Sequence, residues 1–155
     1  MSNTDIKAAP VDTGDARELL KEYEQELFQR WSGPLRHDQT EAPAASTGLV
    51  PPDGLFLLAR VNGSPAGCVG IRALSPGVGE IKRMFVRPAF RGRGVGRSLL
   101  TAVEAEARKL GHTRLRLDTM EELIEARGLY ASSGYIEIAP YTTNPYIRHW
   151  LEKTL

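Results

Sequence analysis

The sequence predicts a mixed α/β (α+β) fold, in which helices flank a mostly antiparallel sheet of six to seven strands. Apolar strand-like segments joined by tight turns, the first at Asn62-Gly63, indicate antiparallel hairpins. Further along, a helical apolar stripe separates two strand-like segments, 80–87 and 114–118, and therefore predicts a central parallel pair with a right-handed crossover. The whole chain, 1–155, has the length of one domain.

The expected strands are short segments that are apolar or alternate between apolar and polar residues. Gly, Pro, Asn or Ser residues bound most of them, as turns do. In chain order the expected strands are 6–9, 55–61, 66–74, 80–87, 114–118, 135–139 and 147–151.

Three segments have the apolar spacing of amphipathic helices. Asp12 or Thr13 caps the first, and its stripe consists of Ala16, Leu19, Leu20, Tyr23, Leu27 and Trp31. The stripe of the second is Leu99, Leu100, Val103, Ala107 and Leu110. The segment 119–122, Thr-Met-Glu-Glu, has the spacing of a capping box and predicts the start of a third helix. Residues 35–54 lack periodicity and predict a long loop, a kind of segment that is often functional.

Composition narrows the class of protein. The net charge of +1 argues against a general nucleic-acid binder, and no apolar run is long enough to span a membrane. The N-terminus has no apolar segment of the signal-peptide kind, so we expect a cytoplasmic protein, as a monomer or homodimer. The single cysteine, Cys68, excludes an intrachain disulfide and is interpreted as a small buried thiol. No metal site is predicted.

The stretch from Arg91 to Gly96, Arg-Gly-Arg-Gly-Val-Gly, lies between an expected strand and an expected helix. Such a turn presents unpaired backbone N–H groups at the positive end of a helix dipole, which favours a pyrophosphate ligand. A P-loop would have lysine where Arg97 stands. A dinucleotide fingerprint starting at Gly92 would have glycine at position 97, and Asp118 comes too late to be its acidic residue.

The pattern Arg91-x-x-Gly94-x-Gly96 resembles the acetyl-CoA pyrophosphate motif of the GNAT superfamily of N-acetyltransferases. A second signature of that family, Ala-x-x-Leu-Tyr-x-x-x-Gly-aromatic, is matched by residues 126–135, with Ala126, Leu129, Tyr130, Gly134 and Tyr135. Many family members have asparagine three residues before this alanine, where the present chain has Leu123. This departure puts one hydrogen bond to the pantetheine in doubt.

The resemblance implies acetyl-CoA as cosubstrate and a parallel strand pair that splays to admit its pantetheine arm. The implied binding residues lie on the strand before the glycine-rich turn, in the turn and in the first helical turn after it. They are Met84, Phe85, Val86, Arg91, Gly92, Arg93, Gly94, Val95, Gly96, Arg97 and Ser98. Gly94 and Gly96 are expected to let the backbone approach the pyrophosphate without an intervening Cβ. Alternatively, the arginines form a solvated basic face and the glycines only turn the chain.

The resemblance also assigns two catalytic roles. Tyr130 is the candidate general acid for the departing thiolate, although its helical spacing alone would predict a core tyrosine. Glu80 is the candidate base, because it precedes Arg91 by the same eleven residues as the glutamate base of some family members. The alternative for Glu80 is an ion pair with Lys82 or Arg83. His149 is the second candidate base.

The acceptor is expected between the first helix with the loop after it, about 23–54, and the loop 140–149. Candidate contacts are Glu22, Glu24, Glu26, Trp31, Arg36, Tyr141 and Tyr146, and His37 is expected to be exposed. The predicted function is acetyl transfer to a primary amine of a small molecule or peptide by direct attack. The alternatives are a non-catalytic acyl-CoA-binding regulator on the same fold and an RNA-binding module that uses the Arg-Gly repeats.

Overall fold

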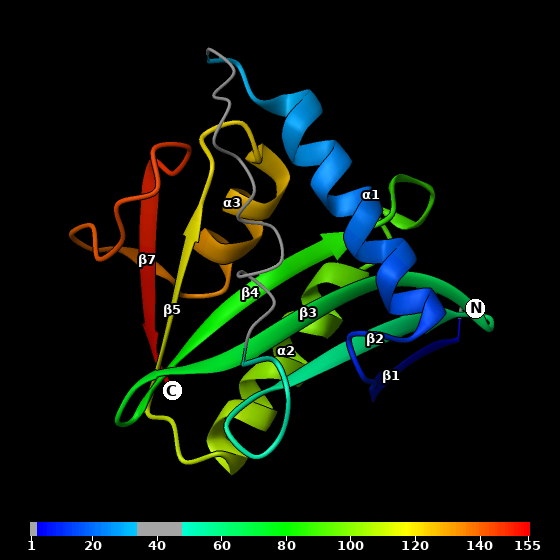
Figure 1. Cartoon of the computed structure of the whole chain (residues 1–155), viewed down its shortest axis with the longest axis horizontal. Coiled ribbons are helices and arrows are strands. Elements are labelled where there is room, and N and C mark those ends of the chain that lie inside the picture. The colour runs from blue at the N-terminus through cyan, green and yellow to red at the C-terminus, as the bar shows by residue number, and fades with distance from the viewer. Residues whose placement is uncertain (1–2, 34–47) are drawn as a thin grey trace.

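The computed structural model describes residues 3–33 and 48–155 of the chain. These residues form a seven-stranded sheet with the spatial order β1-β2-β3-β4-β5-β7-β6 (Figure 1). The strands are β1 (Thr4–Ala8), β2 (Leu55–Val61), β3 (Ser64–Ser75), β4 (Val78–Val86), β5 (Arg114–Thr119), β6 (Ile136–Glu137) and β7 (His149–Thr154). The helices are α1 (Gly14–Arg30), α2 (Val95–Lys109) and α3 (Ile124–Ser132), with a 3₁₀ turn η2 (Pro88–Phe90) before α2.

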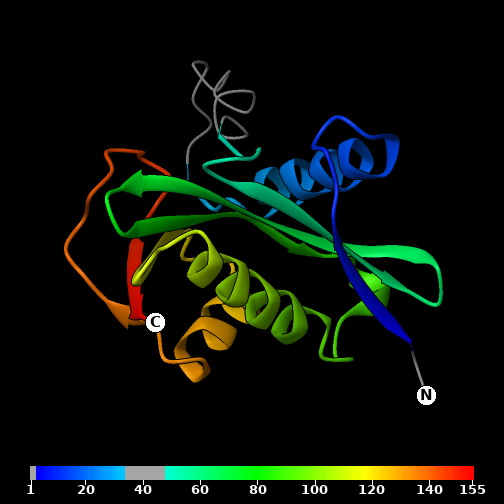
Figure 2. The ribbon, with the colours of Figure 1, turned by 90° about the horizontal axis from the view of Figure 1, so that it is seen from below.

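The predicted fold class is confirmed. β4 and β5, which α2 connects along the chain, form a parallel pair. Every other neighbouring pair in the sheet is antiparallel. In Figure 2, α1 covers one face of the sheet, and α2 and α3 cover the other. The α1 face is closed by an apolar cluster around Leu19, Phe56 and Phe85, and the α2 face by a larger cluster around Leu99 and Leu117.

The parallel strands β4 and β5 separate after a short paired stretch. They are in register from Val78↔Arg114 to Glu80↔Arg116, whereas β5 beyond Arg116 pairs only with β7. Figure 1 shows the C-terminal ends of the two strands pointing apart. The predicted splay of the parallel pair is therefore present.

β4 is also irregular within the splayed part. Its register with β3 shifts between Cys68 and Gly70, and Arg83 has φ = +59°, in the left-handed region that non-glycine residues seldom adopt. The Cys68 thiol donates a hydrogen bond to the Arg83 carbonyl at 3.3 Å. This β-bulge changes the direction of the side chains of β4 at the point where β4 leaves β5.

Two local predictions about the helices need correction. Thr119 and Glu122 do not form a capping box, because Thr119 is the last residue of β5 and α3 begins at Ile124 without a side-chain cap. Glu122 instead accepts hydrogen bonds from Ser32 after α1. α1 ends at Arg30, so Trp31 leaves the helical stripe and packs edge-on against Tyr146.

The last two strands also differ from their predicted bounds. The segment 135–139 was expected to be a strand, but only Ile136–Glu137 pairs with β7. The expected strand 147–151 begins later, at His149, and continues to Thr154. The intervening segment 138–148 turns back across the gap between β4 and β5, and it supplies one wall of the site.

Candidate active site

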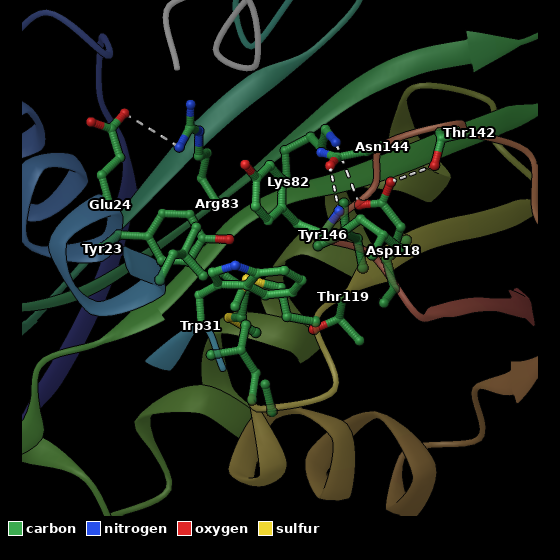
Figure 3. Close-up of a pocket in the computed structure, with 18 of the residues that line it drawn as sticks. Tyr23, Glu24, Trp31, Lys82, Arg83, Asp118, Thr119, Thr142, Asn144 and Tyr146 are labelled. Atoms are coloured by element: carbon green, nitrogen blue, oxygen red, sulfur yellow. Dashed lines mark hydrogen bonds and ion pairs between the residues drawn. The ribbon is translucent and has the colours of Figure 1, made fainter. Parts of the chain in front are cut away.

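The main cavity of the described residues opens where β4 and β5 separate, and it has a volume of about 660 Å³. Residues from α1, the bulged part of β4, the end of β5, the start of α3 and the segment before β7 line it (Figure 3). Because it lies at the carboxyl ends of two parallel strands, the cavity is a favourable position for a ligand that threads through the sheet. The wall of the cavity is apolar near α3 and charged near the segment 142–146.

The glycine-rich turn has the backbone geometry of an anion site. Gly92 and Gly94 have φ of +78° and +80°, and a Cβ at either would meet no atom within 4 Å. Gly94 is the N-cap of α2 and provides no side-chain hydrogen bond to the helix. The first N–H groups of α2 are thus left for a ligand, as the predicted pyrophosphate site requires.

Gly96 has a packing role besides the one predicted for it. A Cβ on Gly96 would lie 3.2 Å from a Leu129 methyl carbon and 3.7 Å from Val86. The absence of a side chain therefore allows α2 to pack closely on α3 and on the end of β4. This packing holds the N-terminus of α2 against α3, the helix whose residues Ala126 and Tyr130 line the cavity.

The three arginines near this turn all have protein partners. Arg91 donates to Glu26 of α1 at 2.6 Å and to the Val86 carbonyl at 2.9 Å, so it ties the turn to α1. Arg97 donates to the Ser132 hydroxyl at 3.1 Å. The Arg93 guanidinium lies over the Phe90 ring, 5.6 Å from its centroid. Binding of the pyrophosphate by these arginines and by Ser98 stays a prediction.

The predicted pantetheine-binding residues of β4 point in different directions. Met84 lines the cavity. The Phe85 side chain is buried on the opposite face and packs against Tyr23 of α1, with 5.9 Å between the ring centroids. Phe85 can therefore meet a ligand in the cavity only through its backbone, which is how the family resemblance uses this strand.

Tyr130 lies in α3 on the wall of the cavity and is only 4% exposed. It packs edge-on against Tyr135, and its hydroxyl has no hydrogen-bond partner within the described residues. Burial, with smaller contributions from Tyr23 and Asp118, raises the pKa of Tyr130 above its ordinary value. The hydroxyl therefore stays protonated and can donate a proton or a hydrogen bond to a group in the cavity.

Glu80 lies at the point where β4 and β5 separate and is 1% exposed. Its carboxylate accepts hydrogen bonds from Arg72 Nε and the Tyr141 hydroxyl, each at 2.9 Å. Lys82 Nζ lies 3.9 Å away, so one of the two expected pairings is present, but Arg72 is the closer cation. Burial and the nearby Glu80 carboxylate raise the pKa of Tyr141, which therefore remains a donor to Glu80.

His149 and Cys68 lie away from the chemistry assigned to the cavity. His149 is held between Glu121 and Glu137, with nitrogen to oxygen distances of 2.5 and 2.6 Å, and lines a separate hollow of about 140 Å³. Cys68 is fully buried in β3, and burial raises its pKa to about 12. It is the inert thiol that the sequence predicts.

The candidate acceptor contacts separate into two groups. Glu24, Trp31 and Tyr146 line the cavity, together with Tyr23 of the helical stripe. Glu22 and Glu26 instead form ion pairs with Arg87 and Arg91, and Tyr141 bonds Glu80 as described above. The other two candidates, Arg36 and His37, lie outside the described residues.

Two cavity residues, Asp118 and Thr142, were missed in the sequence analysis. Asp118 belongs to β5 and lines the cavity (Figure 3). Its carboxylate accepts a hydrogen bond from Thr142 Oγ1 at 3.1 Å and lies 3.7 Å from Lys82 Nζ. One signal could have found Asp118. It is a polar residue at the end of the strand parallel to β4, on the face opposite the buried Leu117. Thr142 carried no such signal.

The fold and the site are those of an acyltransferase: a sheet opened between two parallel strands, with a glycine turn and an uncapped helix at the opening. Residues 14–135 match the acetyltransferase (GNAT) family, and the chain belongs to this family.

Relatives extend this assignment over the rest of the chain. An uncharacterised N-acetyltransferase of Schizosaccharomyces pombe is 36% identical over 148 residues, which cover 93% of this chain and 90% of that protein. The IAA acetyltransferase of Azospirillum brasilense is 37% identical over 122 residues, 78% of each chain. The PaiA N-acetyltransferase of Thermoplasma acidophilum, solved in complex with coenzyme A, has the same fold, with a TM-score of 0.73, 16% identity and 99% of each chain covered.

These similarities confirm the predicted family and the predicted enzyme class. They also support the predicted cosubstrate at the level of the family, because a protein of the same fold carries coenzyme A. Within the described residues, no helix is both long and apolar enough to cross a membrane.

Proposed function

We propose that this protein transfers the acetyl group of acetyl-CoA to a primary amine by direct attack. The observation that carries the proposal is the cavity between the splayed strands. Its apolar side is bounded by α3, on which the start of α2 packs at Gly96, and its charged side contains Lys82 and Asp118. Such a cavity can hold an acyl donor and an amine on opposite sides of one reacting centre.

The donor site would be built from the turn and from β4. The N–H groups at the start of α2 and the positive-φ backbone at Gly92 and Gly94 suit a pyrophosphate. Met84 and the apolar face of α3 would line the path of the pantetheine arm. Acetyl-CoA supplies a thioester, whose carbonyl carbon is open to attack and whose thiolate is a stable leaving group.

The acceptor reacts only after it has lost a proton, because an alkyl ammonium has a pKa near 10.4. We assign this proton to Glu80, reached through water, since its carboxylate is buried behind Arg72 and Tyr141. The amine nitrogen then bonds to the carbonyl carbon, the carbon–sulfur bond breaks, and the sulfur takes a proton from Tyr130. A second proton leaves the nitrogen and restores the hydroxyl.

Tyr130→Phe tests the assigned acid. A CoA thiolate with a thiol pKa of about 8.5 leaves tolerably well unaided, so we expect kcat to fall by less than the roughly 10²–10⁴-fold of essential acid–base catalysts. Steady-state kinetics should show the fall, with acetyl-CoA affinity by calorimetry unchanged. Complete loss of turnover with acetyl-CoA binding intact would contradict this role.

The function itself is tested by thiol release from acetyl-CoA over a panel of amino acids, polyamines, aminoglycosides, arylalkylamines and peptide N-termini. The proposal requires amine-dependent release and an acetylated amine by mass spectrometry. Tight acetyl-CoA binding with no release for any amine would favour a non-catalytic acyl-CoA-binding protein. The RNA-binding alternative predicts nucleic-acid affinity that falls steeply with salt.

A further inference from the structure

The charged side of the cavity contains a carboxylate that is incompletely hydrogen-bonded. The Asp118 side chain is 10% exposed, and Thr142 donates to one of its oxygens, Oδ2. The other oxygen, Oδ1, has Lys82 Nζ at 3.7 Å, too far for a hydrogen bond, and accepts none from the described residues. A nearly buried carboxylate oxygen of this kind favours a charged donor from a ligand.

The surroundings fix the position of Asp118. Thr142 Oγ1, which donates to Asp118, accepts in turn from the Trp150 indole at 2.8 Å. The negative charge of Asp118 contributes to the raised pKa values of Tyr23, Tyr130 and Tyr141, so the carboxylate lies within electrostatic reach of three buried hydroxyls. One of them belongs to the assigned acid. Asp118 and Tyr130 line the same cavity, so a cation bound to Asp118 would share it with the assigned acid.

The charge on the rest of the wall argues against a polycationic ligand. The charged residues that line the cavity are Glu24, Arg72, Lys82, Arg83 and Asp118. Each of the two carboxylates has a cation within 3.7 Å, Arg83 for Glu24 and Lys82 for Asp118. The Glu24 side chain is 43% exposed and the Asp118 side chain 10%, so the wall has one nearly buried carboxylate for a single ammonium and no extended acidic field to attract several.

The remaining wall is aromatic. Trp31 and Tyr146 meet edge-on with ring centroids 4.7 Å apart, and both line the cavity beside Tyr23 (Figure 3). Phe28, one turn earlier in α1, also lines it although its side chain is 58% exposed. An aromatic surface of this kind is suited to covering a flat apolar group.

We propose that the acceptor is a primary monoamine with a flat apolar body, which binds with its ammonium on Asp118 Oδ1 and its body against Trp31, Phe28 and Tyr146. This inference rests on the proposed function and names the acceptor class of the same site. Asp118 is the residue that recognises the amine, and Glu80, which also lies near Lys82, receives the proton through water.

The first test compares acceptors on the wild-type protein. With acetyl-CoA saturating, we expect kcat/KM for 2-phenylethylamine and tryptamine to exceed that for spermidine and kanamycin by roughly tenfold or more. The two polycations lack a flat body for the aromatic wall and bring further positive charges towards Arg72, Lys82 and Arg83. A preference for spermidine or kanamycin overturns the inference and leaves the proposed function intact. If no acetyl group is transferred to any of these four amines, nor to any other amine of the panel, the proposed function itself is wrong.

The second test compares Asp118→Asn with Glu80→Gln. For Asp118→Asn we expect KM for 2-phenylethylamine to rise roughly 10–100-fold, the cost of one charge-assisted hydrogen bond, with KM for acetyl-CoA unchanged. Glu80→Gln should instead lower kcat and alter its dependence on pH. Asp12→Asn, an exposed carboxylate in the turn before α1, is the matched control and should leave both constants unchanged.

If Asp118→Asn leaves KM for the amine within about threefold of wild type, Asp118 does not bind the ammonium and the inference is wrong. If the Asp118→Asn variant fails to fold, the KM values of a second variant, Trp31→Ala, test the inference instead. Loss of the aromatic wall should raise KM for tryptamine more than KM for n-propylamine, which has no flat body. Equal effects on the two amines would overturn the inference.

Discussion

Single residues show how strongly burial decides chemical behaviour here. His112, between α2 and β5, is 9% exposed, and neither ring nitrogen has a hydrogen-bond partner among the described residues. Burial lowers its pKa below the ordinary value of about 6.5. The unfolded chain therefore binds a proton more readily than the folded one, and stability falls as the pH drops below about 6.5 towards the lowered pKa.

His112→Leu should remove this dependence. We expect the variant to lose less stability than wild type between pH 7 and pH 5, because the leucine has no group to protonate. At pH 7 its free energy of unfolding should be equal or higher, since two unpaired nitrogens are gone. Urea unfolding at both pH values measures the difference, and the same loss in both proteins would contradict the assignment.

At the scale of elements, the glycine before α2 is required by its backbone conformation, whereas the glycine inside α3 is not. Gly94 begins α2 with φ = +80°, which a residue with a Cβ adopts at a cost, whereas Gly128 lies inside α3 with open space where a Cβ would stand. Gly94 gives the turn before α2 its left-handed backbone. Gly128 only loses backbone entropy on folding.

Two matched substitutions test this contrast. Gly94→Ala should lower the free energy of unfolding by about 1 kcal/mol and weaken acetyl-CoA binding, because it strains the N-cap. Gly128→Ala should raise the free energy of unfolding by about 0.5–1 kcal/mol. Urea unfolding measures both, and isothermal calorimetry measures the binding. Equal effects of the two changes on stability would contradict the reading.

At the scale of the whole molecule, a buried polar group connects the elements behind the site. Glu104 of α2 is 8% exposed and accepts from the Tyr135 hydroxyl at 2.7 Å and from Lys153 Nζ of β7 at 3.0 Å. These bonds join α2, the end of α3 and β7 on one side of the splayed strands. The position of Tyr130 depends on them, since Tyr135 packs on its ring.

Lys153→Met should lower the free energy of unfolding by about 1–3 kcal/mol, because it leaves a nearly buried carboxylate without its cation. Lys109→Met is the control, since Lys109 is 72% exposed in its pair with Glu106 and should change stability by about 0.5 kcal/mol or less. Denaturant unfolding of both variants measures the difference. If the two substitutions have the same effect, the buried group does not hold the elements together.

Most of the fold and part of the site were predictable from local patterns. Strand alternation, the Asn62-Gly63 turn and the helical stripes act over a few residues, so they predicted the sheet and its central parallel pair. The capping box at Thr119–Glu122 was wrong because pairing with β7 extends β5 to Thr119. Local spacing could not include that competing contact.

By itself, the sequence predicted the family, because its two signatures, one around Gly94 and one around Tyr130, are each complete within a short stretch of chain. Only the tertiary structure decided which side chains share the cavity. It enclosed Glu80 behind Arg72 and Tyr141 and committed Arg91 to Glu26. It also brought Asp118 to the cavity wall beside Thr142. Contacts between residues this far apart in the chain depend on strand register and on where two strands part, which no short stretch of sequence contains.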